Sequence, residues 1–310
     1  MSLYQKPANK GAPRAGPATP QQRTARLNPM MACDTAFRLA ARRYLRELAA
    51  CHELTCEGDP DALHRMRIAL TRLRTAILFF SPMVADSRRA RIRTGLKWLN
   101  SQLGVVRDLD VAIEQLNAVH EDGPHTETHY RSWSERRVEG HRALARALRS
   151  PRCRGLMAST SEWIESGPWS TTKGKRAMKA RASPIADYSA EKLARWQAKL
   201  LRKSQKLLKM DAEKRHRLRL LNKKLSYSLE AFEDLFSDKR FGGHEARLKH
   251  LRRAQRSLGQ LNDDAKGHSL SAALHREGAH ASLQFLSPKR EKRLLRTAAN
   301  AYHELSALED

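Results

Sequence analysis

The 310-residue sequence lacks features that several common protein classes require. Its four cysteines are too few for a disulfide scaffold, and none of them forms a CxxC pair. No stretch of 18 residues is apolar and free of charge, so the sequence predicts no membrane-spanning helix. The N-terminal residues contain no apolar segment typical of a secretory signal, which favours a cytoplasmic location. Runs of β-branched residues alternating with polar ones are also missing, so we expect no sheet.

Acidic and aromatic residues are both scarce. Lys and Arg number 59 against 33 Asp and Glu, a formal net charge of +26, and aromatic residues make up only 6%. A positive excess of this size predicts a polyanionic partner, which could be nucleic acid, an anionic membrane surface or polymeric phosphate. Because the aromatic residues are not interleaved with the basic ones, stacking on nucleic-acid bases is disfavoured. Nucleic acid is therefore the alternative and polymeric phosphate the leading prediction.

Composition divides the chain into an arm and a body. Residues 1–30 hold five prolines, five basic residues and no acidic residue, which predicts a disordered basic arm. Later prolines fall between segments of helical period, so the body, residues 31–310, is predicted to be all-α. A stretch rich in Gly, Pro, Ser and basic residues, 166–187, is interpreted as a linker between a first half, 31–165, and a second half, 188–310. The expected helices are 31–56, 61–80, 87–121, 126–149, 152–165, 187–209, 211–236, 244–264, 268–286 and 289–308.

The two halves repeat each other. The block from His64 to Ile68 (HRMRI) aligns with the block from His216 to Leu220 (HRLRL), 152 residues later. A second block, Leu103 to Asp108 (LGVVRD), aligns with Leu258 to Asp263 (LGQLND), 155 residues later. Two blocks that recur in the same order indicate an internal duplication. We therefore expect two similar helical bundles related by a pseudo-two-fold axis.

Each repeat places a row of polar, mostly basic residues beside an apolar stripe of helical period. The row in the first copy consists of His64, Arg67, Thr71 and Arg74. The row in the second copy consists of His216, Arg219, Lys223 and Ser226. No acidic residue lies between positions 64 and 74. Because like charges one helical turn apart repel, an anionic ligand explains the uncompensated rows better than a solvated basic surface does.

These blocks resemble the conserved histidine α-helical domain, the CHAD family, over residues 31 to 308. In the first half the matching residues are His64, Arg67, Ile68, Arg72, Leu73, Arg74, Phe80, Leu96 to Leu99, Leu103, Gly104, Arg107, Asp108, Asp110 and Val111. In the second half they are His216, Arg219, Lys223, Lys224, Leu225, Tyr227, Glu230, Gln255, Leu258, Gly259, Asn262 and Asp263. The resemblance implies a pair of four-helix bundles around a basic central groove or pore that binds inorganic polyphosphate without catalysis. It also implies an association with polyphosphate granules.

The resemblance and the basic rows together give a set of candidate polyphosphate ligands. These are His64, Arg67, Arg72, Arg74, Lys97, His216, Arg219, Lys223, Lys224 and Arg252. Two positions depart from the family pattern, because Thr71 stands where the family usually has a base and Ser226 where it usually has Arg. Arg72 and Lys224 lie one residue off the rows, so solvent or a partner helix is an alternative environment for both.

No catalytic residue, cofactor or metal ligand is predicted. Asp108 and Asp263 could be mistaken for paired catalytic carboxylates, but we expect them to hold arginines or helix-end donors. His125 and His129 have the i, i+4 spacing of metal ligands but lack a third ligand, and the Cys51–Cys56 segment is a weaker zinc candidate. A phosphate-cleaving enzyme needs metal-binding carboxylates beside the cations, and the rows contain none. The sequence therefore predicts a binding protein and not an enzyme, with no particular protein partner indicated.

Overall fold

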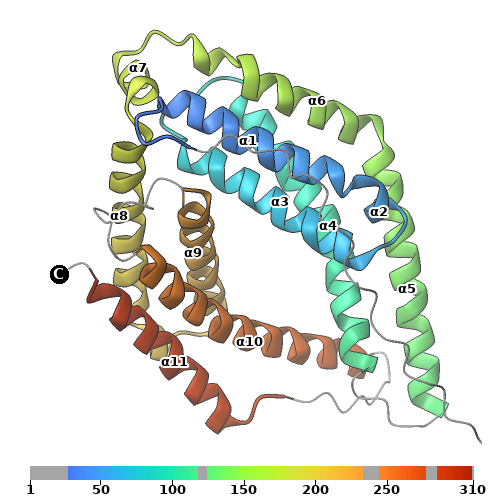
Figure 1. Ribbon diagram of the computed structural model, residues 1–310. Helices are drawn as coiled ribbons and strands as arrows, with labels where there is room; N and C mark the ends of the chain where they lie inside the picture. Colours follow the sequence, from blue (N-terminus) through green and yellow to red (C-terminus); the bar gives the residue numbers. More distant parts are fainter. Residues whose placement is uncertain (1–26, 118–123, 233–243, 277–284, 309–310) are drawn as a thin grey trace, which may run out of the picture.

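The computed structural model describes residues 27–117, 124–232, 244–276 and 285–308. Within these ranges the chain forms eleven α-helices and two short 3-10 helices, with no strand (Figure 1). None of the described helices is long and apolar enough to cross a bilayer. The helices are α1 (Cys33–Ala50), α2 (His52–Cys56), α3 (Pro60–Phe79), α4 (Arg89–Asn117), α5 (Pro124–Arg149), α6 (Pro151–Ser166), η1 (Pro168–Ser170), α7 (Lys175–Ala182), α8 (Ile185–Ser204), η2 (Leu207–Lys209), α9 (Ala212–Ala231), α10 (His244–Arg276) and α11 (Pro288–Ser306).

The two helices that carry the basic rows begin with the same capping chemistry. The Asp59 carboxylate accepts hydrogen bonds from the backbone N–H groups of Asp61 and Ala62 at 2.8 and 2.9 Å, at the start of α3. The Asp211 carboxylate accepts one from the backbone N–H of Lys214 at 2.7 Å, at the start of α9. A side-chain oxygen in this position satisfies donors that the first turn leaves free.

The expected all-α fold is confirmed, and several elements differ from their expected bounds. The expected helix 31–56 is divided at Cys51 into α1 and α2. The expected helices 244–264 and the first part of 268–286 form one helix, α10, because Gly267 is buried within it and does not end it. The basic arm at 1–30 lies outside the described residues up to position 26.

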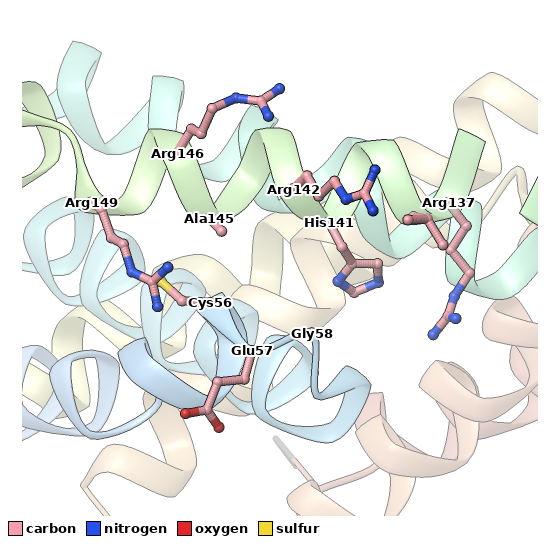
Figure 2. Close-up of a pocket in the computed structure, with 10 residues that line it drawn as sticks. Cys56, Glu57, Gly58, Arg137, His141, Arg142, Ala145, Arg146 and Arg149 are labelled. Atoms are coloured by element: carbon pink, nitrogen blue, oxygen red, sulfur yellow. The ribbon is translucent and has the colours of Figure 1, made fainter. Parts of the chain in front are cut away.

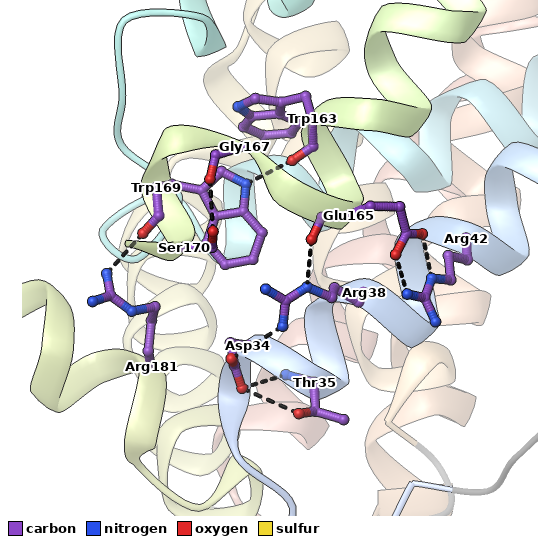
Figure 3. A network of polar contacts seen from close by, with 10 residues as sticks. All are labelled: Asp34, Thr35, Arg38, Arg42, Trp163, Glu165, Gly167, Trp169, Ser170 and Arg181. Atoms are coloured by element: carbon purple, nitrogen blue, oxygen red, sulfur yellow. Dashed lines mark hydrogen bonds and ion pairs between the residues drawn. The ribbon is translucent and has the colours of Figure 1, made fainter. Parts of the chain in front are cut away.

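The stretch 166–187, expected to be a linker, contains η1, α7 and the start of α8. Trp169 anchors it, because its indole N–H donates to the Trp163 carbonyl at 2.8 Å and its ring is completely buried. Arg181 of α7 donates to the Trp169 carbonyl at 2.7 Å, and Arg42 of α1 pairs with Glu165 of α6 (Figure 3). Pro and Gly in this stretch therefore mark tight turns between packed segments, and the two halves are joined through ordered structure.

Helices of the two halves contact one another in the same order. In the first half α1 packs on α3, α3 on α4 and α4 on α5, and in the second half α8 packs on α9, α9 on α10 and α10 on α11. The halves meet where α3 contacts α9 and where α4 contacts α10. This arrangement agrees with the duplication, while a pseudo-two-fold axis remains a prediction.

Aromatic residues at the C-terminal ends of α3 and α9 join the two halves in one core. The rings of Phe79 and Phe232 lie 4.8 Å apart, and those of Phe80 and Phe232 lie 6.0 Å apart. Phe80 and Phe232 occupy equivalent positions in the repeat, and both are buried. The apolar stripe predicted for α3 is also buried; its members are Met66, Leu70, Leu73, Ile77 and Phe80.

Candidate functional site

The basic rows of the two copies come together where α3 contacts α9. Burial lowers the pKa of Arg67 on α3, and the nearby charges of Arg107 on α4 and Arg219 on α9 add to this effect. Arg67, Arg107, Arg219 and Lys223, which we call the central basic cluster, come from α3, α4 and α9. The central members of the two rows therefore lie near one another, while a groove or pore at this place remains a prediction.

Lys223 is the most strongly perturbed member of the central basic cluster. Burial lowers the pKa of its ammonium group to about 8, and the neighbouring charges of Arg219, Arg67 and Arg72 act in the same direction. Lys223 forms no ion pair with any described carboxylate. The buried Nε of Arg219 likewise has no hydrogen-bond partner. Cations held in this way are costly, because neither water nor an opposite charge compensates them fully.

The two histidines at the starts of the rows have different surroundings. Burial lowers the pKa of His64, with the charges of Arg107, Arg67 and Lys223 adding to the effect and Asp61 opposing it. His64 therefore lies beside the central basic cluster. His216 instead forms a 2.6 Å hydrogen bond between its Nδ1 and the side-chain oxygen of Asn262 on α10. This contact joins two residues of the second repeat, so the two histidines are not equivalent in environment.

Arg72 and Arg252 share one carboxylate. Glu230 of α9 lies 3.6 Å from Arg72 and 3.1 Å from Arg252, and Arg72 also approaches Glu47 of α1 at 3.8 Å. The guanidinium of Arg72 and the ammonium of Lys223 lie 5.4 and 5.3 Å from the centre of the Tyr227 ring. Arg72 therefore faces partner helices, one of the two environments expected for it.

Arg74 and Lys224 belong to a second group of cations. Burial lowers the pKa of both side chains. The charge of Arg93 adds to this effect at Arg74, and the charges of Arg74 and Lys199 add to it at Lys224. We call these four residues, from α3, α4, α8 and α9, the flanking basic cluster: Arg74, Arg93, Lys199 and Lys224. Lys97 is exposed on α4, one helical turn beyond Arg93, and so continues the same side of that helix.

Asp108 connects the two halves beside the central basic cluster. Its carboxylate accepts a 2.6 Å hydrogen bond from the ammonium group of Lys266 on α10, and its charge opposes the lowering of the Arg67 pKa. Arg107, the preceding residue, pairs with Glu114 at 2.9 Å. The hydrogen-bond partner of Asp108 is therefore a lysine, whereas arginines or helix-end donors were expected. Asp263, its counterpart, accepts only a weak 3.4 Å hydrogen bond from Asn262.

The two departures from the family pattern occupy the rows without adding charge. The Thr71 hydroxyl donates to the Arg67 carbonyl at 2.8 Å, within its own helix. Ser226 is buried, and its hydroxyl has no hydrogen-bond partner in the described structure. Each copy therefore presents one cation fewer at the α3–α9 contact than the family pattern would supply.

A group of possible metal ligands lies on α2, apart from the basic rows. Donor atoms of His52, Glu53 and Cys56 all lie within 4.8 Å of one another. The Glu53 carboxylate is already held by Arg149 at 2.6 Å, which leaves one imidazole and one thiol. The side chains of His125 and His129 lie outside the described residues. The prediction that the protein holds no metal remains a prediction.

Four residues that the structure places in or beside the clusters were not among the candidate ligands: Arg107, Arg93, Lys199 and Lys266. Arg107 belongs to a repeated motif, and Arg93 precedes Lys97 by one helical turn, so both had a signal in the sequence. Lys199 and Lys266 reach the clusters from α8 and α10 through tertiary packing. Helical spacing along a single segment contains no signal for such residues.

Comparisons with known proteins identify the same fold. The family model described as CHAD domain matches residues 39–272. The CHAD domain from the plant Ricinus communis is 22% identical, with 94% of this chain and 93% of that chain covered and a TM-score of 0.70. PptA from Streptomyces chartreusis is 15% identical, with 90% and 97% covered and a TM-score of 0.58. No curated protein matches the chain. At such low identities the two structures show a shared fold alone.

Proposed function

The chain belongs to the CHAD domain family, and on that premise we propose that it binds inorganic polyphosphate, without catalysis, at the central basic cluster. The observation that carries the proposal is the set of half-buried cations at the α3–α9 contact, above all Lys223 and Arg219, whose Nε has no hydrogen-bond partner among the described residues. A phosphate chain would supply the missing negative charge and the missing hydrogen-bond acceptors.

The arrangement suits a linear polymer of phosphates. Arginines offer planar, bidentate donors to phosphate oxygens, and a lysine offers a compact charge that adjusts its position. The flanking basic cluster lies further along the same helices, since Arg74 follows Arg67 by seven residues, about 10 Å of helix. A chain long enough to contact both clusters gains affinity from the second contact without a second loss of translational freedom.

The surroundings of the central basic cluster support binding without catalysis. The acidic residue that acts on Arg67, Asp108, is held by Lys266, and Glu230 is shared by Arg72 and Arg252. The metal-ligand group of the described residues lies on α2 and not at the cluster. Phosphate cleavage by metal ions needs carboxylates that hold those ions next to the substrate. We extend the proposal to an association with polyphosphate granules in the cytoplasm, where such a polymer is concentrated.

Nucleic acid is the second candidate ligand, and the surroundings of Tyr227 argue against it. Proteins that bind single strands without sequence preference stack bases on aromatic rings beside a basic surface. Tyr227 is the aromatic residue that contacts the basic residues of α3 and α9 in the described structure, and Arg72 and Lys223 lie over its ring. A ring covered by cations is poorly placed to receive a base. This contact favours polyphosphate over nucleic acid.

A competition experiment tests the proposal. Long-chain polyphosphate and a DNA duplex compete for the protein at equal total anionic charge, and we expect polyphosphate to displace the DNA. The double variant Arg67→Ala/Arg219→Ala should lose this preference, because it removes one central arginine from each repeat. Replacing Arg256 and Arg296, exposed on α10 and α11, serves as a control of equal charge change. The proposal fails if DNA wins or if the central double variant binds polyphosphate like the wild type.

A further inference from the structure

A groove that borders α5 contains a separate set of basic side chains. It lies between α5 and the segment where α2 ends and α3 begins, and its volume is about 640 Å³ (Figure 2). The residues that line it are Cys56, Glu57, Gly58, Arg137, Val138, His141, Arg142, Ala145, Arg146 and Arg149. None of the candidate polyphosphate ligands predicted from the sequence belongs to this set.

The basic residues of the groove follow one line along α5. Arg137, His141, Ala145 and Arg149 are each separated by four residues, so their side chains lie on one face of the helix. Twelve residues of helix from Arg137 to Arg149 extend about 18 Å. The small Ala145 leaves room between the basic residues. The spacing therefore matches an elongated anion better than a single compact ion.

A buried carboxylate fixes one end of this line. Asp110 of α4 is 2% exposed and accepts hydrogen bonds from Arg137 Nε at 2.7 Å and from His141 Nε2 at 2.8 Å. Burial acts to raise the pKa of Asp110, but the bonds from His141 and Arg137 outweigh it, so the pKa is lowered and the carboxylate is charged. Arg137 uses only its Nε in this pair. Its terminal nitrogens therefore stay available in a fixed position, as a preorganised anion donor requires.

Other cations along the groove are partly or wholly uncompensated. Arg142 is exposed and forms no ion pair with any described acid. Arg149 pairs with Glu53 through one terminal nitrogen and remains 54% exposed. Arg146 pairs with Glu139, and Figure 2 shows its guanidinium turned away from the groove. The donors that face a ligand are therefore Arg137, Arg142 and Arg149.

The wall opposite α5 includes bare backbone at Gly58. Gly58 has a φ of +93°, which favours glycine, and a Cβ built there would lie 3.7 Å from Nδ1 of His141. Any side chain at this position would extend over the imidazole from the opposite wall. The acidic lining residue, Glu57, turns its carboxylate away from α5 (Figure 2). Neither residue obstructs an anion lying along α5.

We propose that this groove is a second binding site for a chain of two or more phosphoryl groups. The inference rests on the proposed function in that it assigns the same ligand class to a second place. Arg107 of the central basic cluster and Asp110, which holds Arg137 and His141 of the groove, lie three residues apart on α4 and so on neighbouring positions of one helix face. The ligand is a short free oligophosphate or a segment of a long polymer that also occupies the central basic cluster.

Cys56 provides a reporter inside the groove. Cys33 and Cys153 are buried, while Cys51 and Cys56 are partly exposed, so a Cys51→Ser variant leaves Cys56 as the accessible thiol. Its alkylation by iodoacetamide, a neutral reagent, is followed by mass spectrometry with tripolyphosphate, with long-chain polyphosphate, or with sulfate at equal ionic strength. At about ten times the dissociation constant, we expect tripolyphosphate to slow the reaction about tenfold, whereas sulfate does not.

Two double variants separate this site from the central one. Protection of Cys56 by tripolyphosphate should persist in Arg67→Ala/Arg219→Ala and disappear in Arg142→Gln/Arg149→Gln. The Arg256→Gln/Arg296→Gln variant should behave like the Cys51→Ser background. Protection by the long polymer but not by tripolyphosphate assigns the groove to a segment of the polymer and supports the proposal.

Three results overturn the inference: no protection by either phosphate, equal protection by sulfate, or protection unchanged in Arg142→Gln/Arg149→Gln. Failure of the proposed function is recognised separately. In that case the Arg67→Ala/Arg219→Ala variant retains its full preference for long-chain polyphosphate over DNA, whatever happens at Cys56.

Discussion

Lys223 lies among Arg67, Arg72 and Arg219 and pairs with no carboxylate of the described residues, and its pKa is lowered to about 8. A lysine of this kind binds its proton more weakly in the folded chain than in the unfolded chain. Stability therefore rises with pH between about 8 and the ordinary value near 10.5, and the charged form destabilises the fold below that window. The full pKa shift of Lys223 corresponds to a destabilisation of roughly 3 kcal/mol in the ligand-free protein at neutral pH.

We expect the charge of Lys223 to strengthen ligand binding and to lower the free energy of unfolding. We expect Lys223→Met to raise the free energy of unfolding by about 1–3 kcal/mol at pH 7 and to weaken polyphosphate binding about tenfold. Urea unfolding and a binding titration measure the two effects. A variant that is both less stable and unchanged in affinity would contradict this account of the residue.

The same lysine should make binding depend on pH. Because a polyphosphate chain favours the charged ammonium, affinity should fall by about threefold or more as the pH rises from 7 to 9 through the lowered pKa. Lys223→Arg keeps its charge over this range, so its affinity should change little. Parallel profiles for the wild type and Lys223→Arg would show that Lys223 does not contact the ligand.

At the scale of helices, one buried amide positions α9 against its neighbours. Asn222, beside Lys223, donates to the Leu251 carbonyl and to the Gln255 side chain, both at 3.0 Å, and accepts from the Tyr302 hydroxyl at 3.2 Å. Because all of these groups are buried or nearly so, loss of the amide leaves several of them without partners.

Asn222→Ala should lower the free energy of unfolding by about 2–4 kcal/mol. Tyr302→Phe removes only the longest of the three bonds and should cost about 1 kcal/mol. Denaturant titrations of both variants provide the comparison. Equal stability of the two variants would mean that the amide does not tie α9 to α10 and α11.

Helices and their apolar faces could largely be predicted from the sequence, because both depend on local spacing. The stripe that includes Met66, Leu70 and Leu73 is buried as helical period requires. The order of α7 could not be predicted in this way, since it depends on Trp169 contacts with Trp163 and Arg181. Local composition there is rich in Gly, Pro and basic residues and is typical of a loop.

The candidate site could likewise be predicted only where it depends on local spacing. Helical spacing and the repeat identified the two rows, and the structure brings Arg67, Arg219 and Lys223 of these rows near one another. Which cations acquire acidic partners depends on tertiary contacts, so the sharing of Glu230 by Arg72 and Arg252 was not predictable. The groove along α5 also could not be predicted from local sequence, because its opposite wall belongs to a segment about 80 residues earlier in the chain.

At the scale of the whole molecule, the net charge of +26 implies that association with a polyanion is sensitive to salt. By analogy with counterion release from nucleic acid, the logarithm of the affinity should fall linearly with the logarithm of the salt concentration. Arg67→Ala/Arg219→Ala should reduce this slope by about 2, one for each lost phosphate contact, whereas Arg256→Gln/Arg296→Gln should not. A slope unaffected by the central double variant would indicate nonspecific attraction to the molecule as a whole.

The contact of Phe79 and Phe80 with Phe232 has a consequence for the duplicated chain. Each copy covers aromatic surface that the other would otherwise expose to water, so we expect neither copy to fold independently. Fragments cut at the connecting segment should aggregate when expressed singly and recover their structure only when mixed. We therefore expect urea to unfold both repeats in one cooperative transition rather than one after the other.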